Sequence, residues 1–177
     1  GQGDVIVRNC LVEDACIAQG DAFKGGSAFT LCGRHEGTFL FEHNVYRAGF
    51  RKDRLRFTKP GVPYGTGAFM AWEADRAGLN GTLVLRDNEF RFAPGTGDRA
   101  VVSIGGCKKV LVLGANQFVS GGEQPALALD PLNPQGRPVS TLNKATFVAA
   151  ATKLVGKLEL RGGTPSEEEL ARLRREP

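Results

Sequence analysis

Short runs of alternating apolar and polar residues recur along the chain in a fixed order. Residues 38–46 (TFLFEHNVY), 82–90 (TLVLRDNEF) and 110–118 (VLVLGANQF) share apolar residues two positions apart, then Asn, then an aromatic residue two positions later. Residues 139–147 (VSTLNKATF) keep the frame but carry Ala where Asn is expected. Alternation over about five residues, bounded by Gly, Asn, Asp or Pro, is typical of short β-strands.

A second alternating run starts from alanine and accompanies this phrase. It reads AFTLC at Ala28, AFMAW at Ala68, AVVSI at Ala100 and ALALD at Ala126. The repeating unit is therefore predicted to be a pair of short strands. The alanines lie 40, 32 and 26 residues apart, so the repeat tolerates insertions, which belong in external loops. No helical period separates the strands, and this argues against a doubly wound α/β sheet.

A phrase that returns in phase predicts a chain that coils and stacks equivalent strands on one another. Matched residues of successive units then form continuous columns in a parallel solenoid. The Asn residues are expected at a bend, because Asn tolerates the left-handed conformation and can bond to nearby backbone. The predicted interior columns are Phe39, Leu83 and Leu111; Phe41, Leu85, Leu113 and Leu142; and Tyr46, Phe90, Phe118 and Phe147, with Asn44, Asn88 and Asn116 at the bend.

The tail has a different pattern and divides the chain into residues 1–163 and 164–177. Thr164, Pro165 and Glu167 are predicted to be the N-cap, the first helical residue and the capping-box acid of a short helix. Acidic residues precede basic ones, in agreement with the helix dipole. We expect the helix to cover one end of the stacked strands. The alternative is a frayed, charged tail.

Composition narrows the class of protein only slightly. The chain has 177 residues and a net charge of +4. It contains no apolar run of about 20 residues, the length needed to cross a bilayer, so no membrane partner is expected. A mild positive charge alone does not favour nucleic acid as the partner. The four cysteines include no C-x-x-C pair, which argues against zinc and thioredoxin-type motifs and favours free thiols.

Candidate acid–base residues gather in one repeat. The chain has two histidines, His35 and His43, and each stands beside a glutamate, Glu36 and Glu42 respectively. Imidazole titrates near neutral pH, so such pairs suit general acid–base catalysis. Neither H-x-x-x-H nor H-E-x-x-H spacing is present, and no metal site is predicted from the residues. The alternative is that Arg34 to Glu36 form a solvated turn and that Glu42 and His43 lie on the outer face.

The repeated phrase, the Asn column and the variable loops resemble the right-handed parallel β-helix of the pectate-lyase-like superfamily. This resemblance covers most of residues 5–160 and implies an all-β right-handed parallel β-helix of about four to five coils. It also implies an extracellular or periplasmic protein that binds or cleaves polysaccharides. In such lyases Ca²⁺ or a cationic side chain neutralises the uronate carboxylate.

Two short elements carry a likeness to the alginate and chondroitin lyase branch. The segment GDAFKGG contains Lys24, and GRHEG contains Arg34. By this resemblance Lys24 and Arg34 are candidate bases, in addition to the candidate catalytic residues His35 and His43. The family has Arg-His-Gly where this chain has Arg-His-Glu-Gly. Calcium would need clustered oxygen ligands, for which Glu13, Asp14, Asp21 and Glu42 are the candidates.

A basic segment lies in the longest insertion between units. Residues 47–59 (RAGFRKDRLRFTK) hold six cationic residues and one acid. Neighbouring aromatic residues could stack on sugar rings, as they do on nucleic-acid bases. We therefore predict that an anionic polymer binds here, with Glu36 and Glu42 as further contacts. The predicted cationic binding residues are Arg47, Arg51, Lys52 and Arg54.

The sequence thus predicts a carbohydrate-binding or polysaccharide-processing module acting on an acidic polysaccharide. If the chain is an enzyme, it is a polysaccharide lyase or a glycoside hydrolase. The small number of repeats favours either part of a longer β-helix or a module that binds without cleaving. The alternative class is a non-catalytic structural solenoid of the adhesin, surface-layer or phage-tail kind. The sequence does not predict the oligomeric state.

Overall fold

The structure is a computed structural model. It describes residues 3–13, 29–31, 36–48, 69–71, 79–94, 100–105, 107–130 and 146–175. Within these ranges the chain forms fifteen strands and one helix. This helix is too short and too polar to cross a membrane, and no other candidate membrane span is found in these ranges.

The strands form three five-stranded sheets, and every neighbouring pair in them is parallel. Sheet A contains β1 (Val5–Arg8), β4 (Thr38–Glu42), β7 (Leu79–Arg86), β10 (Cys107–Leu113) and β13 (Phe147–Val148). Sheet B contains β2 (Leu11–Glu13), β5 (Val45–Ala48), β8 (Glu89–Phe92), β11 (Gln117–Val119) and β14 (Lys153–Val155). Sheet C contains β3 (Phe29–Leu31), β6 (Phe69–Ala71), β9 (Val102–Ile104), β12 (Leu127–Leu129) and β15 (Leu158–Leu160). The predicted all-β class with parallel pairing is confirmed.

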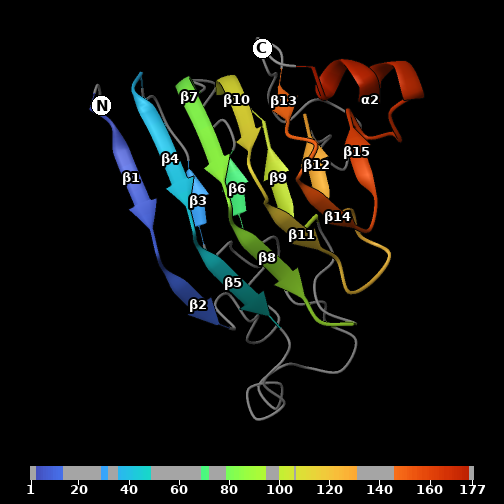
Figure 1. Cartoon of the computed structure of the whole chain (residues 1–177), viewed down its shortest axis with the longest axis horizontal. Coiled ribbons are helices and arrows are strands. Elements are labelled where there is room, and N and C mark those ends of the chain that lie inside the picture. Colours follow the sequence, from blue (N-terminus) through green and yellow to red (C-terminus); the bar gives the residue numbers. More distant parts are fainter. Residues whose placement is uncertain are drawn as a thin grey trace, which may run out of the picture.

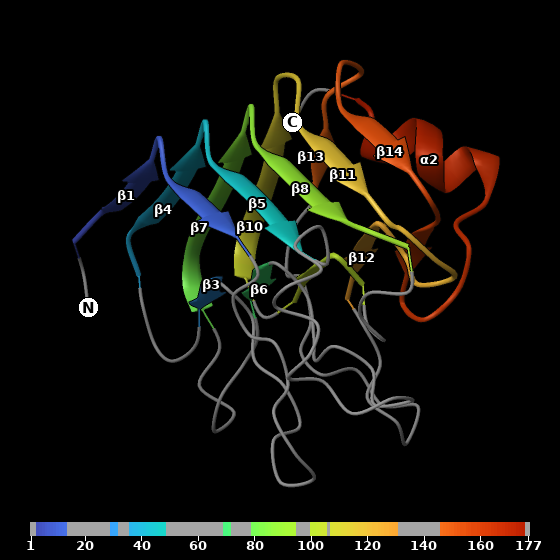
Figure 2. The same cartoon turned by 90° about the horizontal axis from the view of Figure 1, so that it is seen from below.

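Consecutive strands enter sheets A, B and C in turn, and this order repeats along the chain (Figures 1 and 2). The predicted unit of two strands is wrong, because the repeated phrase itself contains two strands. His43 has a φ of 53°, and the chain bends there between β4 and β5. The alanine-led run supplies the third strand, such as β12.

The interior column of sheet B forms as expected over its central strands. Tyr46 pairs with Phe90, and Phe90 pairs with Phe118. All three side chains are at most 2% exposed. The rings of Phe90 and Phe118 stack with centroids 5.8 Å apart and an interplanar angle of 12°. This column lies in the buried hydrophobic core that the three sheets share.

In sheet A the predicted columns are correct for β4 and β7 but wrong by one residue for β10. Phe39 pairs with Leu83 and Phe41 with Leu85. Leu83 and Leu85 then pair with Val110 and Val112, and not with Leu111 and Leu113. Both valines are fully buried, whereas the two leucines are partly exposed.

The shift arises from one extra residue at the bend between β10 and β11. Asp87 and Asn88 separate β7 from β8, whereas three residues, 114–116, separate β10 from β11. Gly114 adopts a φ of +70°, and the backbone N–H of Ala115 donates to Asp87 Oδ1 at 2.7 Å. The extra residue is therefore absorbed locally, and Phe118 keeps its place in sheet B.

Replacing Gly114 tests this account of the bend. A Cβ at residue 114 would collide with the carboxylate of Asp87, and the left-handed conformation disfavours any side chain with a Cβ. We expect Gly114→Ala to lower the free energy of unfolding by about 1–3 kcal/mol. Chemical denaturation measures this loss. The control is Gly122→Ala, where the added Cβ would meet only the flexible end of Gln124; equal losses in both variants would contradict the account.

The prediction for the last copy of the phrase is also wrong. Phe147 pairs with Leu111 in sheet A, so it does not extend the column of Tyr46, Phe90 and Phe118. Leu154 of β14 takes that place opposite Phe118. The phrase at residues 139–147 lacks the Asn that marks the bend, and the matching bend comes later, at residues 149–152. Leu142 lies outside the described residues.

The asparagines form a buried ladder at the bends between sheets A and B. The backbone N–H of Asn44 donates to Asn88 Oδ1 at 3.0 Å, and that of Asn88 donates to Asn116 Oδ1 at 2.9 Å. Their amide groups donate in turn to backbone carbonyls such as Phe41 O, at 2.9 Å from Asn88 Nδ2. The predicted bonding to backbone is confirmed. The left-handed residues, however, are His43 and Asp87, which precede the asparagines.

Helix α2 (Glu167–Leu173) confirms the short terminal helix, but its N-cap is Ser166 and not Thr164. Ser166 and Glu169 form the capping box, and the hydrogen bond from the Ser166 backbone lowers the pKa of Glu169. The box therefore lies two residues later than predicted. Leu173 is buried in the core cluster, and α2 lies at the β15 end of the sheets (Figure 1).

Candidate functional site

The candidate site is an open groove of about 390 Å³ on the outer face of sheet B. It is lined by Glu13, Arg47, Glu89 and Arg91. Successive residues of a strand point to opposite faces, and their neighbours Val12, Tyr46 and Phe90 point to the interior. Glu13 pairs with Arg47, and Arg47 pairs with Arg91, on three adjacent strands.

Glu89 holds both arginines of the groove. Its Oε1 lies 3.3 Å from Nε of Arg47 and 3.3 Å from Nε of Arg91. Arg47 donates a hydrogen bond, whereas Nε of Arg91 is buried and not aligned for one, so that contact is an ion pair only. Both contacts are made by the Nε atom of the arginine.

The exposure of these side chains suits a ligand that arrives from solvent. Glu89 is 22% exposed, while Arg47 and Arg91 are 45% and 39% exposed. Guanidinium groups bind carboxylates through paired N–H donors, and carboxylates such as Glu13 accept hydrogen bonds from hydroxyl groups. The groove can therefore bind a ligand that carries both anionic groups and hydroxyls.

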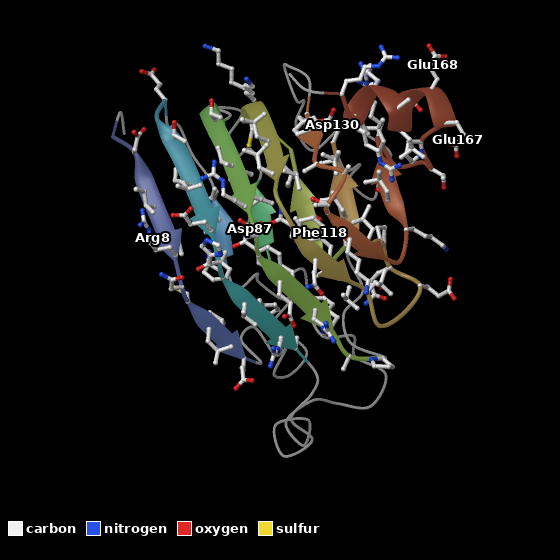
Figure 3. The ribbon with its side chains drawn as sticks, in the orientation of Figure 1. Arg8, Asp87, Phe118, Asp130, Glu167 and Glu168 are labelled. Carbon is white, nitrogen blue, oxygen red and sulfur yellow. The ribbon has the colours of Figure 1, made fainter. Side chains whose placement is uncertain are left out.

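Glu42, which the sequence predicts as a binding residue, belongs to a second charged cluster on sheet A. Its carboxylate lies 3.3 Å from Nε of Arg8 and 3.8 Å from Nη1 of Arg86. Only 14% of its side chain is exposed. The two arginines sit on the strands to either side of it (Figure 3 shows Arg8). Glu42 therefore bridges three strands and has few surfaces left for a ligand.

The remaining predicted residues fall into two groups. Among the described residues, His43 lies on the bend after β4 with an exposed side chain, and Glu36 is exposed just before β4. Of the predicted site residues that the structure describes, Arg47 and the calcium candidate Glu13 line the groove. The others, namely Lys24, Arg34, His35, Arg51, Lys52 and Arg54, together with the calcium candidates Asp14 and Asp21, lie outside the described residues.

Metal binding finds no support in the described ranges. No group of three or more His, Cys, Asp or Glu side chains there is arranged to hold a metal ion. Cys10 and Cys107 are free thiols; the other two cysteines are outside these ranges. Burial, followed by the charge of Asp130, raises the pKa of Cys107 to about 12. Its thiol stays protonated at neutral pH, so it is a poor nucleophile and metal ligand.

Glu89 and Arg91 were missed by the sequence analysis, although the signal was present. Arg47 and Arg91 both stand three residues after the Asn of their phrase, and Glu89 stands one residue after Asn88. When the outward positions of the phrase are aligned in the same way as the inward ones, these three side chains fall on the neighbouring strands β5 and β8. In sheet B, one alignment of the repeats therefore predicts both the buried aromatic column and the outward groove residues Arg47 and Arg91.

Comparison of the chain with protein-family models, curated proteins and solved structures finds no match.

Proposed function

We propose that the chain is a right-handed parallel β-helix of five coils, and that its groove on sheet B binds an acidic polysaccharide. The chain is proposed to bind without cleaving, at the surface of a cell or outside it. The observation that carries the proposal is the pair of exposed arginines, Arg47 and Arg91, held side by side by Glu89.

The order of the strands supports the β-helix. Each sheet receives every third strand, in sequence order, and all pairs are parallel. A chain that returns to each sheet once per repeat without crossing itself forms a coil, and each passage through three sheets is one turn. Right-handed crossovers between parallel strands are strongly favoured by strand twist, and this supports the handedness.

The rows of outward side chains support a polymer as the ligand. Glu89 continues across sheet B through Gln117 to Lys153. Adjacent strands lie about 4.8 Å apart, so the groove residues extend into a row of charged and amide groups parallel to the stack of strands. A chain of sugar units can follow such a row and contact it repeatedly. A small ligand would use only the groove.

An array of acidic and neutral glycans tests the binding of the groove. We expect acidic polysaccharides to bind, and the double variant Arg47→Ala/Arg91→Ala to raise Kd about tenfold or more, because charge-assisted hydrogen bonds contribute about 1.5–3 kcal/mol. Binding should weaken with salt. The control Arg172→Ala/Arg174→Ala removes the same charge from exposed positions in the last turn and at the C-cap of α2. Equal loss in both double variants would contradict a specific site.

The basic insertion is a separate candidate for the same ligand. The triple variant Arg51→Ala/Lys52→Ala/Arg54→Ala tests it on the same array. Loss of binding in this variant, with the groove variant unaffected, would assign the ligand to the insertion and overturn the groove. Single-stranded nucleic acid belongs on the array as an anionic competitor, because it satisfies the charge requirement.

Cleavage and scaffolding are the two alternatives. A lyase would raise the ultraviolet absorbance of unsaturated uronates, and a hydrolase would release reducing ends without that absorbance. A chain that binds no glycan favours the structural solenoid. One observation favours that scaffold: Glu42 and Glu89 each hold two arginines within the protein, so these charges already stabilise the stacking of strands.

A further inference from the structure

The outward side chains of sheet B form two rows that cross its strands. Strands β2, β5, β8, β11 and β14 pair in this order (Figure 1), so the register places one residue of each strand in each row. The first row consists of Glu13, Arg47, Arg91, Val119 and Val155, and the second row of Leu11, Val45, Glu89, Gln117 and Lys153. The groove takes its lining residues from β2, β5 and β8. Both rows continue beyond the groove onto β11 and β14.

The charge of the outward side chains changes from strand to strand. Glu13 on β2 is exposed and negative, and β5 and β8 follow with the two arginines of the groove. The outward residues of β11 are Gln117 and Val119, which carry no charge. On β14 the exposed cation Lys153 lies beside Val155 in sequence register. The described strands of sheet B therefore offer two cationic positions that are separated by one uncharged strand.

The spacing of these positions relates the rows to the sugars of a polymer. Adjacent strands lie about 4.8 Å apart, so Arg91 on β8 and Lys153 on β14, two strands further, are separated by about 10 Å along the stack. One sugar unit of an extended polysaccharide advances by about the distance between two adjacent strands. Two positions that lie two strands apart therefore meet every second sugar.

We infer that the acidic polysaccharide bound by sheet B is an alternating polymer, in which each acidic sugar is followed by a neutral one. This inference rests on the proposed glycan binding and specifies its substrate class. One acidic sugar binds between Arg47 and Arg91, and the next binds at Lys153. The neutral sugar between them lies over β11. There the amide of Gln117 exchanges hydrogen bonds with its hydroxyl groups, and Val119 packs against its apolar face.

A polymer with an acid on every sugar fits these rows poorly. It would place a carboxylate over Val119, on the strand whose outward residues are uncharged. Moving a carboxylate from water to an apolar side chain without an opposite charge is unfavourable. On the other side of the arginines a carboxylate would meet Glu13 and be repelled, whereas Glu13 can accept hydrogen bonds from the hydroxyls of a neutral sugar. Both sides of the arginine pair thus favour a neutral sugar.

Isothermal titration calorimetry with two hexasaccharides tests the alternation. In the hyaluronan hexasaccharide every second sugar is a uronate, and in the galacturonate hexamer every sugar is one. The neutral chitin hexamer is the blank. We expect the Kd for the hyaluronan hexasaccharide to be about tenfold or more below that for the galacturonate hexamer. Equal or tighter binding of the galacturonate hexamer would overturn the alternation but not the groove, and binding of neither acidic hexamer would overturn both.

The variant Val119→Lys separates the spacing of charges from the identity of the sugars. The added cation faces the carboxylate that the wild-type chain leaves without a partner, so the Kd for the galacturonate hexamer should fall about tenfold while that for hyaluronan changes much less. Val155→Lys is the matched control. It makes the same substitution at a position that is 41% exposed, on the strand where Lys153 already supplies a cation, and should leave the ratio of the two Kd values unchanged.

Circular dichroism verifies that both variants are folded. A ratio of Kd values that does not move in Val119→Lys, or that moves equally in Val119→Lys and Val155→Lys, would overturn the inference.

Discussion

Asn88→Ala is expected to lower the free energy of unfolding by about 3–5 kcal/mol, since each buried polar group left without its partner costs about 1–3 kcal/mol. The side chain is 1% exposed. Its Oδ1 accepts from the backbone N–H of Asn44 at 3.0 Å and from Asn44 Nδ2 at 3.1 Å. Its Nδ2 donates to Phe41 O at 2.9 Å and to Asn116 Oδ1 at 3.1 Å. Alanine removes all four bonds from the middle of the ladder.

The loss is measured by urea denaturation and by thermal melting, where about 3 kcal/mol corresponds to a fall in Tm of about 6–12 °C for a chain of this size. Gln117→Ala is the matched control: it removes an amide from the partly exposed position next to Asn116 and should change stability by about 0.5 kcal/mol or less. A loss in Asn88→Ala no greater than in the control would show that the ladder does not stabilise the stack.

Cys10 is the first residue of the same ladder in chain order. Cys10 stands where the next three repeats have Asn44, Asn88 and Asn116, and its backbone N–H donates to Asn44 Oδ1 at 3.0 Å. The Asn side chain of the following repeat therefore accepts the backbone N–H at three bends, namely those of Cys10, Asn44 and Asn88. The ladder also explains why the sequence predicts parallel pairing: an Asn that is buried and bonded to the backbone in three successive repeats recurs at matched positions along the chain.

The interior columns show where sequence reasoning reaches its limit. Alternation identified Leu83, Leu85 and Phe90 as buried, and the structure agrees. Valine and leucine at residues 110–113 alternate equally well in either register, because all four residues are apolar. Only the glycine bend at residue 114 decides between the two registers, and an alignment without gaps cannot represent an inserted residue. Val110 and Val112 were missed for that reason.

The site was less accessible to prediction than the fold. The histidines are candidates because imidazole suits acid–base chemistry. The groove, however, is lined by arginines and glutamates that become neighbours only when the strands pair. Arg47 was found through its place in a cationic run, and its partners Glu89 and Arg91 lie more than forty residues away in sequence. The pattern of charges along a chain does not show which charged residues meet across parallel strands. These contacts follow only when the strand register is used to align the outward residues as well as the inward ones.

The second large effect is expected from Phe90→Ala, which should lower the free energy of unfolding by about 3–5 kcal/mol, as typical for a buried aromatic residue truncated to alanine. Phe90 is fully buried, and its ring stacks on that of Phe118 with centroids 5.8 Å apart. Tyr46 lies on the strand to the other side, opposite Phe90. Truncation opens a cavity in the middle of this column, which neighbours held by parallel strands on both sides can fill only in part.

Two variants make this prediction specific to the column. Phe90→Leu keeps most of the volume and should cost about 1.5 kcal/mol or less. Leu154→Ala removes a side chain from the end of the same column, where the residue is partly exposed, and should cost less than Phe90→Ala. Because strands in a stack contact only their neighbours, a central cavity weakens two strand interfaces and a terminal one weakens one. Urea denaturation ranks the three variants, and an equal cost for Leu154→Ala and Phe90→Ala would contradict this description of the core.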